Sequence, residues 1–163
     1  MGQQQLLLVI LVTILVGIAT VVAINVFGTA AEEGNRDAVR QDLLQAAAGA
    51  QALYTRPAAL GGAGGDFTDT DVITLREIMS ALSIPGSFVN PTGGPTDALW
   101  ENENAEYNVA TTNAYTLTIT AVPNSWNDDI QMQVCRDGVD RQWKYDITTD
   151  GSDADAACAA PTG

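Results

Sequence analysis

The sequence has 163 residues, with 20 Asp and Glu, 7 Lys and Arg and no His, which gives a formal net charge of -13. Such a charge repels a phosphate backbone, and the lack of His removes the usual general base and the commonest metal ligand. We therefore expect a protein that is not an enzyme, needs no cofactor and does not bind nucleic acid directly.

The first 31 residues carry no charged side chain, and residues 6–24 form one apolar run. At about 1.5 Å per residue, a helix of this length crosses a bilayer core of about 30 Å. Once out of a membrane it would bury its apolar surface best against copies of itself. The small residues Gly17, Ala19, Thr20 and Ala23 would let such helices approach closely.

Beyond this run, apolar residues recur at steps of three and four from Val39 to Tyr54, up to the break at Pro57. The pattern predicts one unbroken α-helix from Gln3 to Thr55, with gentle bends at most near Gly17 or Gly34. We expect the Thr13 and Thr20 hydroxyls to bond to the backbone four residues earlier. We divide the chain into a helix for membrane insertion and polymerisation, residues 1–56, and a globular head, residues 57–163.

The head should begin with a Gly-rich stretch, residues 58–66, interpreted as a flexible connector rather than a phosphate-binding loop. A short helix is expected next, with Thr68 or Asp69 as its N-cap and Pro85-Gly86 at its end. A two-residue period then predicts four antiparallel strands, at 107–110, 115–122, 130–134 and 142–147. The fold class is therefore α+β, a long helix packed on a small four-stranded antiparallel sheet.

Two cysteines, Cys135 and Cys158, are too few for a Cys-only zinc site and too far apart for a CxxC motif. We expect a structural disulfide, and with it an oxidising compartment. In the acidic tail beyond Thr148, only Cys158 is expected to hold the chain down. The three tryptophans, Trp100, Trp126 and Trp143, are interpreted as core or subunit-contact anchors.

A long apolar N-terminal helix, a loop, a four-stranded antiparallel sheet and a C-terminal disulfide loop follow one another as in type IV pilins. The sequence resembles that family in layout over its whole length. Met1 would be the mature first residue, the apolar run starts on schedule at Leu6, and Gln5 stands where the family has Glu. Val22 stands where the family commonly has proline.

The resemblance implies a subunit of an extracellular filament for adhesion, motility or surface contact, inserted in the inner membrane before assembly. Its partners would be identical subunits in a helical homopolymer. The expected assembly residues are Met1, Gln5, Leu6, Leu7, Ile10, Ile14, Gly17, Val21 and Ile24.

Two alternatives remain open, a pseudopilin of a type II secretion system and a monomeric, single-span membrane-anchored binding domain. Major pseudopilins carry calcium in a C-terminal loop, and Asp150, Asp153 and Asp155 offer oxygen ligands at nearby positions. The full calcium-loop pattern is absent, so a solvated acidic turn is the simpler interpretation.

Overall fold

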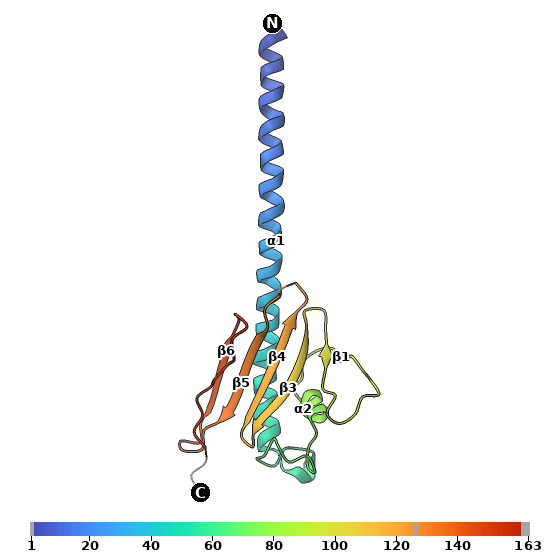
Figure 1. The fold of residues 1–163 in the computed structure, drawn as a ribbon, viewed down its shortest axis with the longest axis vertical. Helices are drawn as coiled ribbons and strands as arrows, with labels where there is room; N and C mark the ends of the chain where they lie inside the picture. Colours follow the sequence, from blue (N-terminus) through green and yellow to red (C-terminus); the bar gives the residue numbers. More distant parts are fainter. Residues whose placement is uncertain (1, 126, 161–163) are drawn as a thin grey trace. The chain divides into compact units, whose positions relative to one another are not determined.

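A computed structural model describes residues 2–125 and 127–160. The chain divides into two compact units, Met1–Gly34 and Asn35–Gly163. The first unit is helical throughout its described residues, whereas the second holds the rest of the long helix, a short helix and the sheet (Figure 1).

Helix α1 runs without interruption over Gly2–Thr55, so the prediction of one continuous helix is confirmed. Gly17 and Gly34 do not break it, because a mid-helix glycine costs only about 1 kcal/mol relative to alanine. From Val39 onward α1 buries one face, since the apolar positions follow the helical period. The buried residues are Val39, Asp42, Leu43, Ala46, Ala47, Ala50, Leu53 and Tyr54.

The Gly-rich loop after α1 does more than connect two elements. It forms a 3-10 turn, η1 (Ala58–Leu60), and then folds back on the end of the helix. The backbone amide of Ala63 donates to the carbonyl of Leu53, and the amide of Gly65 donates to that of Tyr54, both at 3.0 Å. These bonds satisfy carbonyls that every helix end leaves without a partner, so the loop serves as the C-terminal cap of α1.

The short helix α2 (Leu75–Ala81) begins later than the sequence predicted. Its N-cap is Thr74, which forms a capping box with Glu77, and the same hydrogen bonds from Thr74 lower the pKa of the Glu77 carboxyl. The predicted N-caps, Thr68 and Asp69, are wrong. Asp69 accepts a hydrogen bond from the amide of Asp71 instead, a local turn that competes with helix initiation.

The sheet has six strands in the order β1-β2-β3-β4-β5-β6, every neighbouring pair antiparallel. The four predicted strands correspond to β3 (Ala105–Asn113), β4 (Thr116–Pro123), β5 (Ile130–Arg136) and β6 (Trp143–Thr148). The predicted number of strands is wrong, because β1 (Ser87–Phe88) and β2 (Trp100–Glu101) extend the sheet beyond β3. Two-residue strands are too short to show an alternating pattern, so no periodic signal predicts them.

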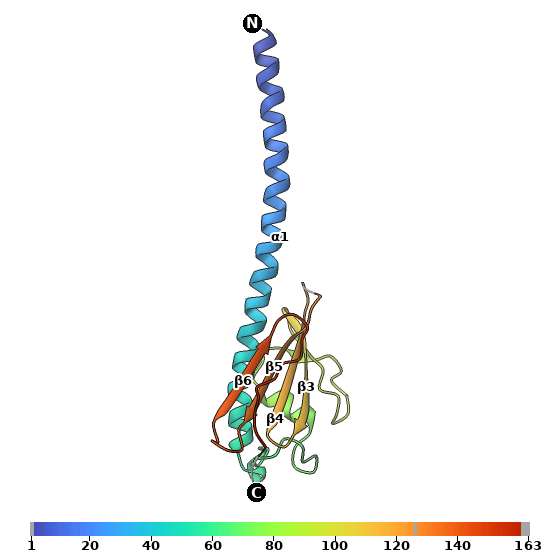
Figure 2. The same cartoon turned by 60° about the vertical axis from the view of Figure 1, so that its left-hand side comes forward.

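One face of the sheet packs against the part of α1 that belongs to the second unit, and α2 lies beside that part (Figures 1 and 2). Residues alternate along β3, with Ala105, Tyr107 and Val109 buried and their neighbours exposed. The same alternation places Leu117, Ile119, Met132 and Val134 in the core between sheet and helix. The predicted packing of helix on sheet is therefore confirmed for this part of α1.

Arg76 of α2 holds the loop between β1 and β2. Its guanidinium donates to the carbonyls of Asn90 and Asp97 at 3.1 Å and to that of Pro91 at 3.0 Å. It also lies 3.7 Å above the centre of the Phe88 ring, which adds a cation–π contact. A single side chain thus fixes the course of this loop through the loop's backbone.

Candidate assembly surface

The N-terminal part of α1 presents apolar side chains on all sides. From Gly2 to Ala31 every described residue is exposed, and Phe27 reaches 74% exposure. This stretch has no charged residue. By length and composition, α1 is therefore long and apolar enough to cross a membrane.

Most of the predicted assembly residues share one stripe of this helix. With 3.6 residues per turn, spacings of three and four keep side chains on one side. The residues on the stripe are Leu6, Leu7, Ile10, Ile14, Gly17, Val21 and Ile24. Gln5 lies on roughly the opposite side of the helix, so the structure does not bring it together with them. Met1 is outside the described residues.

The small and hydroxylated residues within residues 2–31 of α1 are all exposed. A Cβ added at Gly17 would meet no atom within 4 Å. The Thr20 hydroxyl donates to the Val16 carbonyl at 2.8 Å, as predicted, whereas the Thr13 hydroxyl donates to the carbonyl of Ile10, three residues earlier rather than four. Both hydroxyls are therefore satisfied inside the helix, which suits apolar surroundings.

Comparisons with protein-family models, curated proteins and solved structures find no match to this chain. Function therefore has to be inferred from the chemistry of the helix and of the head.

The C-terminal tail of the head is closed by the predicted disulfide. Cys135 and Cys158 are joined, with their Cα atoms 6.2 Å apart. The expectation that Cys158 alone ties down the tail is wrong. The amides of Ala154 and Ala156 donate to the side-chain oxygens of Gln131 at 3.3 Å and of Gln133 at 2.8 Å, respectively, so the tail is also bonded along β5.

The side chain of Asp137 stabilises the turn that follows β5. Its buried carboxylate pairs with the Lys144 ammonium and accepts hydrogen bonds from the amides of Val139, Asp140 and Ala159. The Lys144 hydrogen bond, followed by the backbone amides, holds the pKa of the Asp137 carboxyl well below its usual range. Because Ala159 follows Cys158 directly, this carboxylate and the disulfide hold the same end of the tail.

The acidic turn is spread out rather than gathered around one point. The carboxylate of Asp150 accepts hydrogen bonds from the amide and hydroxyl of Ser152, and these bonds lower the pKa of Asp150. The carboxylate of Asp155 accepts a hydrogen bond from the amide of Ala157. Asp153 is exposed. Within residues 2–125 and 127–160, no group of three or more Asp, Glu, Cys or His side chains is arranged to hold a metal ion.

Two of the tryptophans pack edge-on against aromatic rings of the head. The Trp143 ring lies 5.3 Å from that of Tyr54, and the Trp100 ring lies 4.7 Å from that of Phe88. Both are partly buried against the core, as expected for anchors of the fold. Trp126 is outside the described residues.

A buried carboxylate, Asp42, lies between α1 and the sheet and was not among the predicted functional residues. Asp42 accepts hydrogen bonds from the hydroxyl of Tyr107 at 2.7 Å and from the side-chain amides of Asn102 at 2.9 Å and Asn104 at 3.4 Å. Burial and the bond to Asp42 raise the pKa of the Tyr107 hydroxyl. The signal was present, since Asp42 is a charged residue on the apolar face of a predicted helix.

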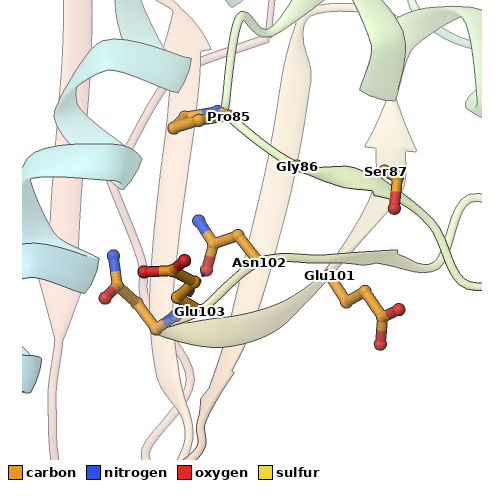
Figure 3. Close-up of a pocket in the computed structure, with 7 residues that line it drawn as sticks. Pro85, Gly86, Ser87, Glu101, Asn102 and Glu103 are labelled. Atoms are coloured by element: carbon orange, nitrogen blue, oxygen red, sulfur yellow. Dashed lines mark hydrogen bonds between the residues drawn. The ribbon is translucent and has the colours of Figure 1, made fainter.

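A groove of ≈ 580 Å³ lies next to this network, beside the turn between β2 and β3 (Figure 3). Its lining residues are Pro85, Gly86, Ser87, Glu101, Asn102, Glu103 and Asn104. The Asn102 side chain is already used, because its amide donates to Asp42 and its oxygen accepts from the amides of Asn104 and Ala105. We assign a structural role to the Asn102 side chain and no chemical function to the groove.

Proposed function

We propose that this chain is the structural subunit of a type IV pilus-like filament, whose copies polymerise through the N-terminal part of α1. The observation that carries the proposal is a helix of Gly2 to Ala31 that is exposed and apolar on every side. A run of this length exposes on the order of 1000 Å² of apolar surface, which costs on the order of 25 kcal/mol in water. Only a membrane or other apolar helices can remove such a cost.

The head supports a role outside the cytosol. A disulfide within a small head is typical of oxidising compartments, and a net charge of -13 favours solubility over non-specific association. We propose that the helix is held in the inner membrane before assembly. Copies then leave the membrane by packing their helices together, and the acidic heads cover the outside of an extracellular filament.

In this arrangement the helix stripe would supply close packing. Gly17 brings two backbones together without a side chain between them, and the satisfied hydroxyls of Thr13 and Thr20 add no unpaired polar group. Gln5 would take part through a neutral amide hydrogen bond at most, worth about 1 kcal/mol. Assembly would thus depend on apolar packing, for adhesion, motility or contact with surfaces.

The test is electron microscopy of material sheared from cells that make this chain, followed by mass spectrometry of the purified filaments. We expect long filaments composed chiefly of this chain. A chain found only in the membrane fraction, with no filaments, would instead indicate a single-span anchored domain. Absence of surface filaments together with a secretion defect in a deletion strain would indicate a pseudopilin.

A further inference from the structure

Basic side chains are scarce in this protein, and most of them have partners inside the chain. Those with an interaction are Arg36, Arg40, Arg76, Arg136 and Lys144. Over residues 2–125 and 127–160, the side chains of Arg56 and Arg141 are left without a hydrogen bond or ion pair. Both are exposed, but their surroundings differ.

Arg56 lines a groove of ≈ 260 Å³ formed by the end of α1 and the end of α2. The other lining residues are Gly49, Ala52, Leu53, Ser80, Ala81 and Ser83. The groove is shaped by close packing of its walls, because a Cβ at Gly49 would lie 2.9 Å from the backbone of Leu82. The Ser80 hydroxyl already donates to the Glu77 carbonyl at 2.8 Å, so Arg56 is the residue that gives the groove its charge and its free donors. A guanidinium has only donors and a positive charge, which is the chemistry that recognises a carboxylate.

The acidic turn at Asp150 to Asp155 lies at the other end of the head. Arg36 marks that end, since its guanidinium donates to the carbonyl of Thr149 at 3.0 Å. Arg56 directly follows Thr55, the last residue of the same helix, some twenty residues after Arg36, which is about 30 Å along the helix. Within one copy the two sites therefore cannot meet. Asp153 is exposed, and its carboxylate makes no hydrogen bond or ion pair among the described residues.

We propose that the Arg56 groove binds the acidic turn of a second copy of this chain, with the carboxylate of Asp153 against the Arg56 guanidinium. This inference rests on the proposed function, and it adds a contact between heads to the packing of helices. The two surfaces are different and stand at opposite ends of the head, so the contact is heterologous and can repeat from copy to copy. In a chain of net charge -13, such a pair also gives the otherwise repelling heads a defined register.

The experiment compares full-length variants by the mass of sheared filaments per cell. Arg56→Glu and Asp153→Arg should each lower that mass by about tenfold, because each places like charges in the contact. The double variant Arg56→Glu with Asp153→Arg should restore it. Arg141→Glu is the matched control for the first variant, since it makes the same change of charge at an exposed arginine outside the groove. Asp71→Arg is the control for the second.

A second measurement keeps the inference testable if charge variants accumulate poorly. The double variant Arg56→Cys with Asp153→Cys should form disulfide-linked ladders in oxidised filaments, and neither single variant should do so. Failure of the charge swap to restore wild-type filaments, equal losses in the control variants, or no ladder would each overturn the contact while leaving the proposed filament in place. Wild-type cells without filaments would overturn both.

Discussion

Helix α1 exposes every large apolar side chain in residues 2–34, whereas in residues 35–55 it buries one face against the sheet. The backbone is the same, since both parts belong to one uninterrupted α-helix. In the second part, contacts within the chain explain which positions are apolar. In the first part, residues 2–31 are all exposed, so burial within the described chain does not explain their apolar composition. Under the proposed function, lipid or further copies would cover them.

The sharpest way to break this comparison is a charge placed in each part. Ile14 and Leu44 are similarly exposed, at 56% and 51%. Ile14→Asp should weaken membrane insertion and lower filament yield, because a carboxylate at the centre of a span costs about 3 kcal/mol. Leu44→Asp should leave the chain in the membrane. Carbonate extraction of membranes measures the difference, and equal retention of both variants would contradict the division.

Neighbouring leucines sharpen the account of the second part. Leu43 is fully buried and Leu44 is half exposed. Leu43→Ala should destabilise the head by about 2–5 kcal/mol, because it leaves a cavity between helix and sheet, and Leu44→Ala by less than about 0.5 kcal/mol. Urea unfolding of the full chain in detergent, followed by tryptophan fluorescence, gives both values. Similar midpoints for the two variants would show that the helix is loosely docked.

Removal of the disulfide separates the head from the exposed helix. The variant with Cys135→Ser and Cys158→Ser should lose about 3 kcal/mol of head stability, as expected for a link spanning 23 residues. Membrane insertion should be unchanged, because the exposed helix contains no cysteine. Protease resistance of the head and carbonate extraction provide the two readouts. A variant that loses membrane insertion along with head stability would show that the two parts are not independent.

Alanine substitutions at the two helical glycines Gly49 and Gly17 should differ in their effect on head stability, by less than the substitutions above. Gly49→Ala should destabilise the head by about 1–3 kcal/mol, since its methyl group would meet the backbone of Leu82. Gly17→Ala should leave the head unchanged, because the added methyl group would meet no described atom within 4 Å beyond the neighbouring turns of its own helix. Thermal unfolding monitors the head, and filament yield reports whether Gly17 is needed for close approach. A Gly49→Ala head that melts at the wild-type temperature would contradict the packing described here.

The smallest expected effect is the pH dependence of the Asp137 ion pair. Its folded pKa lies below the unfolded value, so the stabilisation is complete above about pH 4 and is lost as the pH falls toward the folded pKa. Head stability should thus be flat from pH 7 to 5 and decline below about pH 4. Asp137→Asn should be less stable at pH 7 and decline less steeply. Urea midpoints at pH 7, 5 and 3 test this, and parallel curves would be inconsistent with it.

The parts of the fold that could be predicted are those in which one pattern repeats over many residues. The apolar run over residues 6–24 and the apolar residues at steps of three and four from Val39 to Tyr54 were enough to predict α1. The alternation of apolar and polar residues was enough to predict β3 to β6. The N-cap of α2 could have been found, because Thr74 and Glu77 have the spacing of a capping box. Thr68 and Asp69 were equally plausible by residue type, but neither has a Glu or Gln three residues later.

Other features depend on partners that are distant in the sequence, and local patterns cannot reveal which residues those partners are. Asp42 finds its donors at Asn102 and Tyr107, and Arg76 finds carbonyls in a loop beyond β1. Likewise, the Arg56 groove exists only because α2 returns to the end of α1. The stripe of assembly residues on the exposed part of α1 could be derived from their spacing in the sequence. The surface that the stripe contacts could not be derived in this way.

The way Arg76 holds the loop before β2 bears on how this head can diversify. Its guanidinium bonds to the carbonyls of Asn90, Pro91 and Asp97, and carbonyls are present whatever the side chains are. Thr92 and Thr96 are exposed and contribute none of these bonds. Substitutions there can alter the outer chemistry of the loop while its backbone stays in place, so this part of the surface can change what it recognises at little cost to the fold.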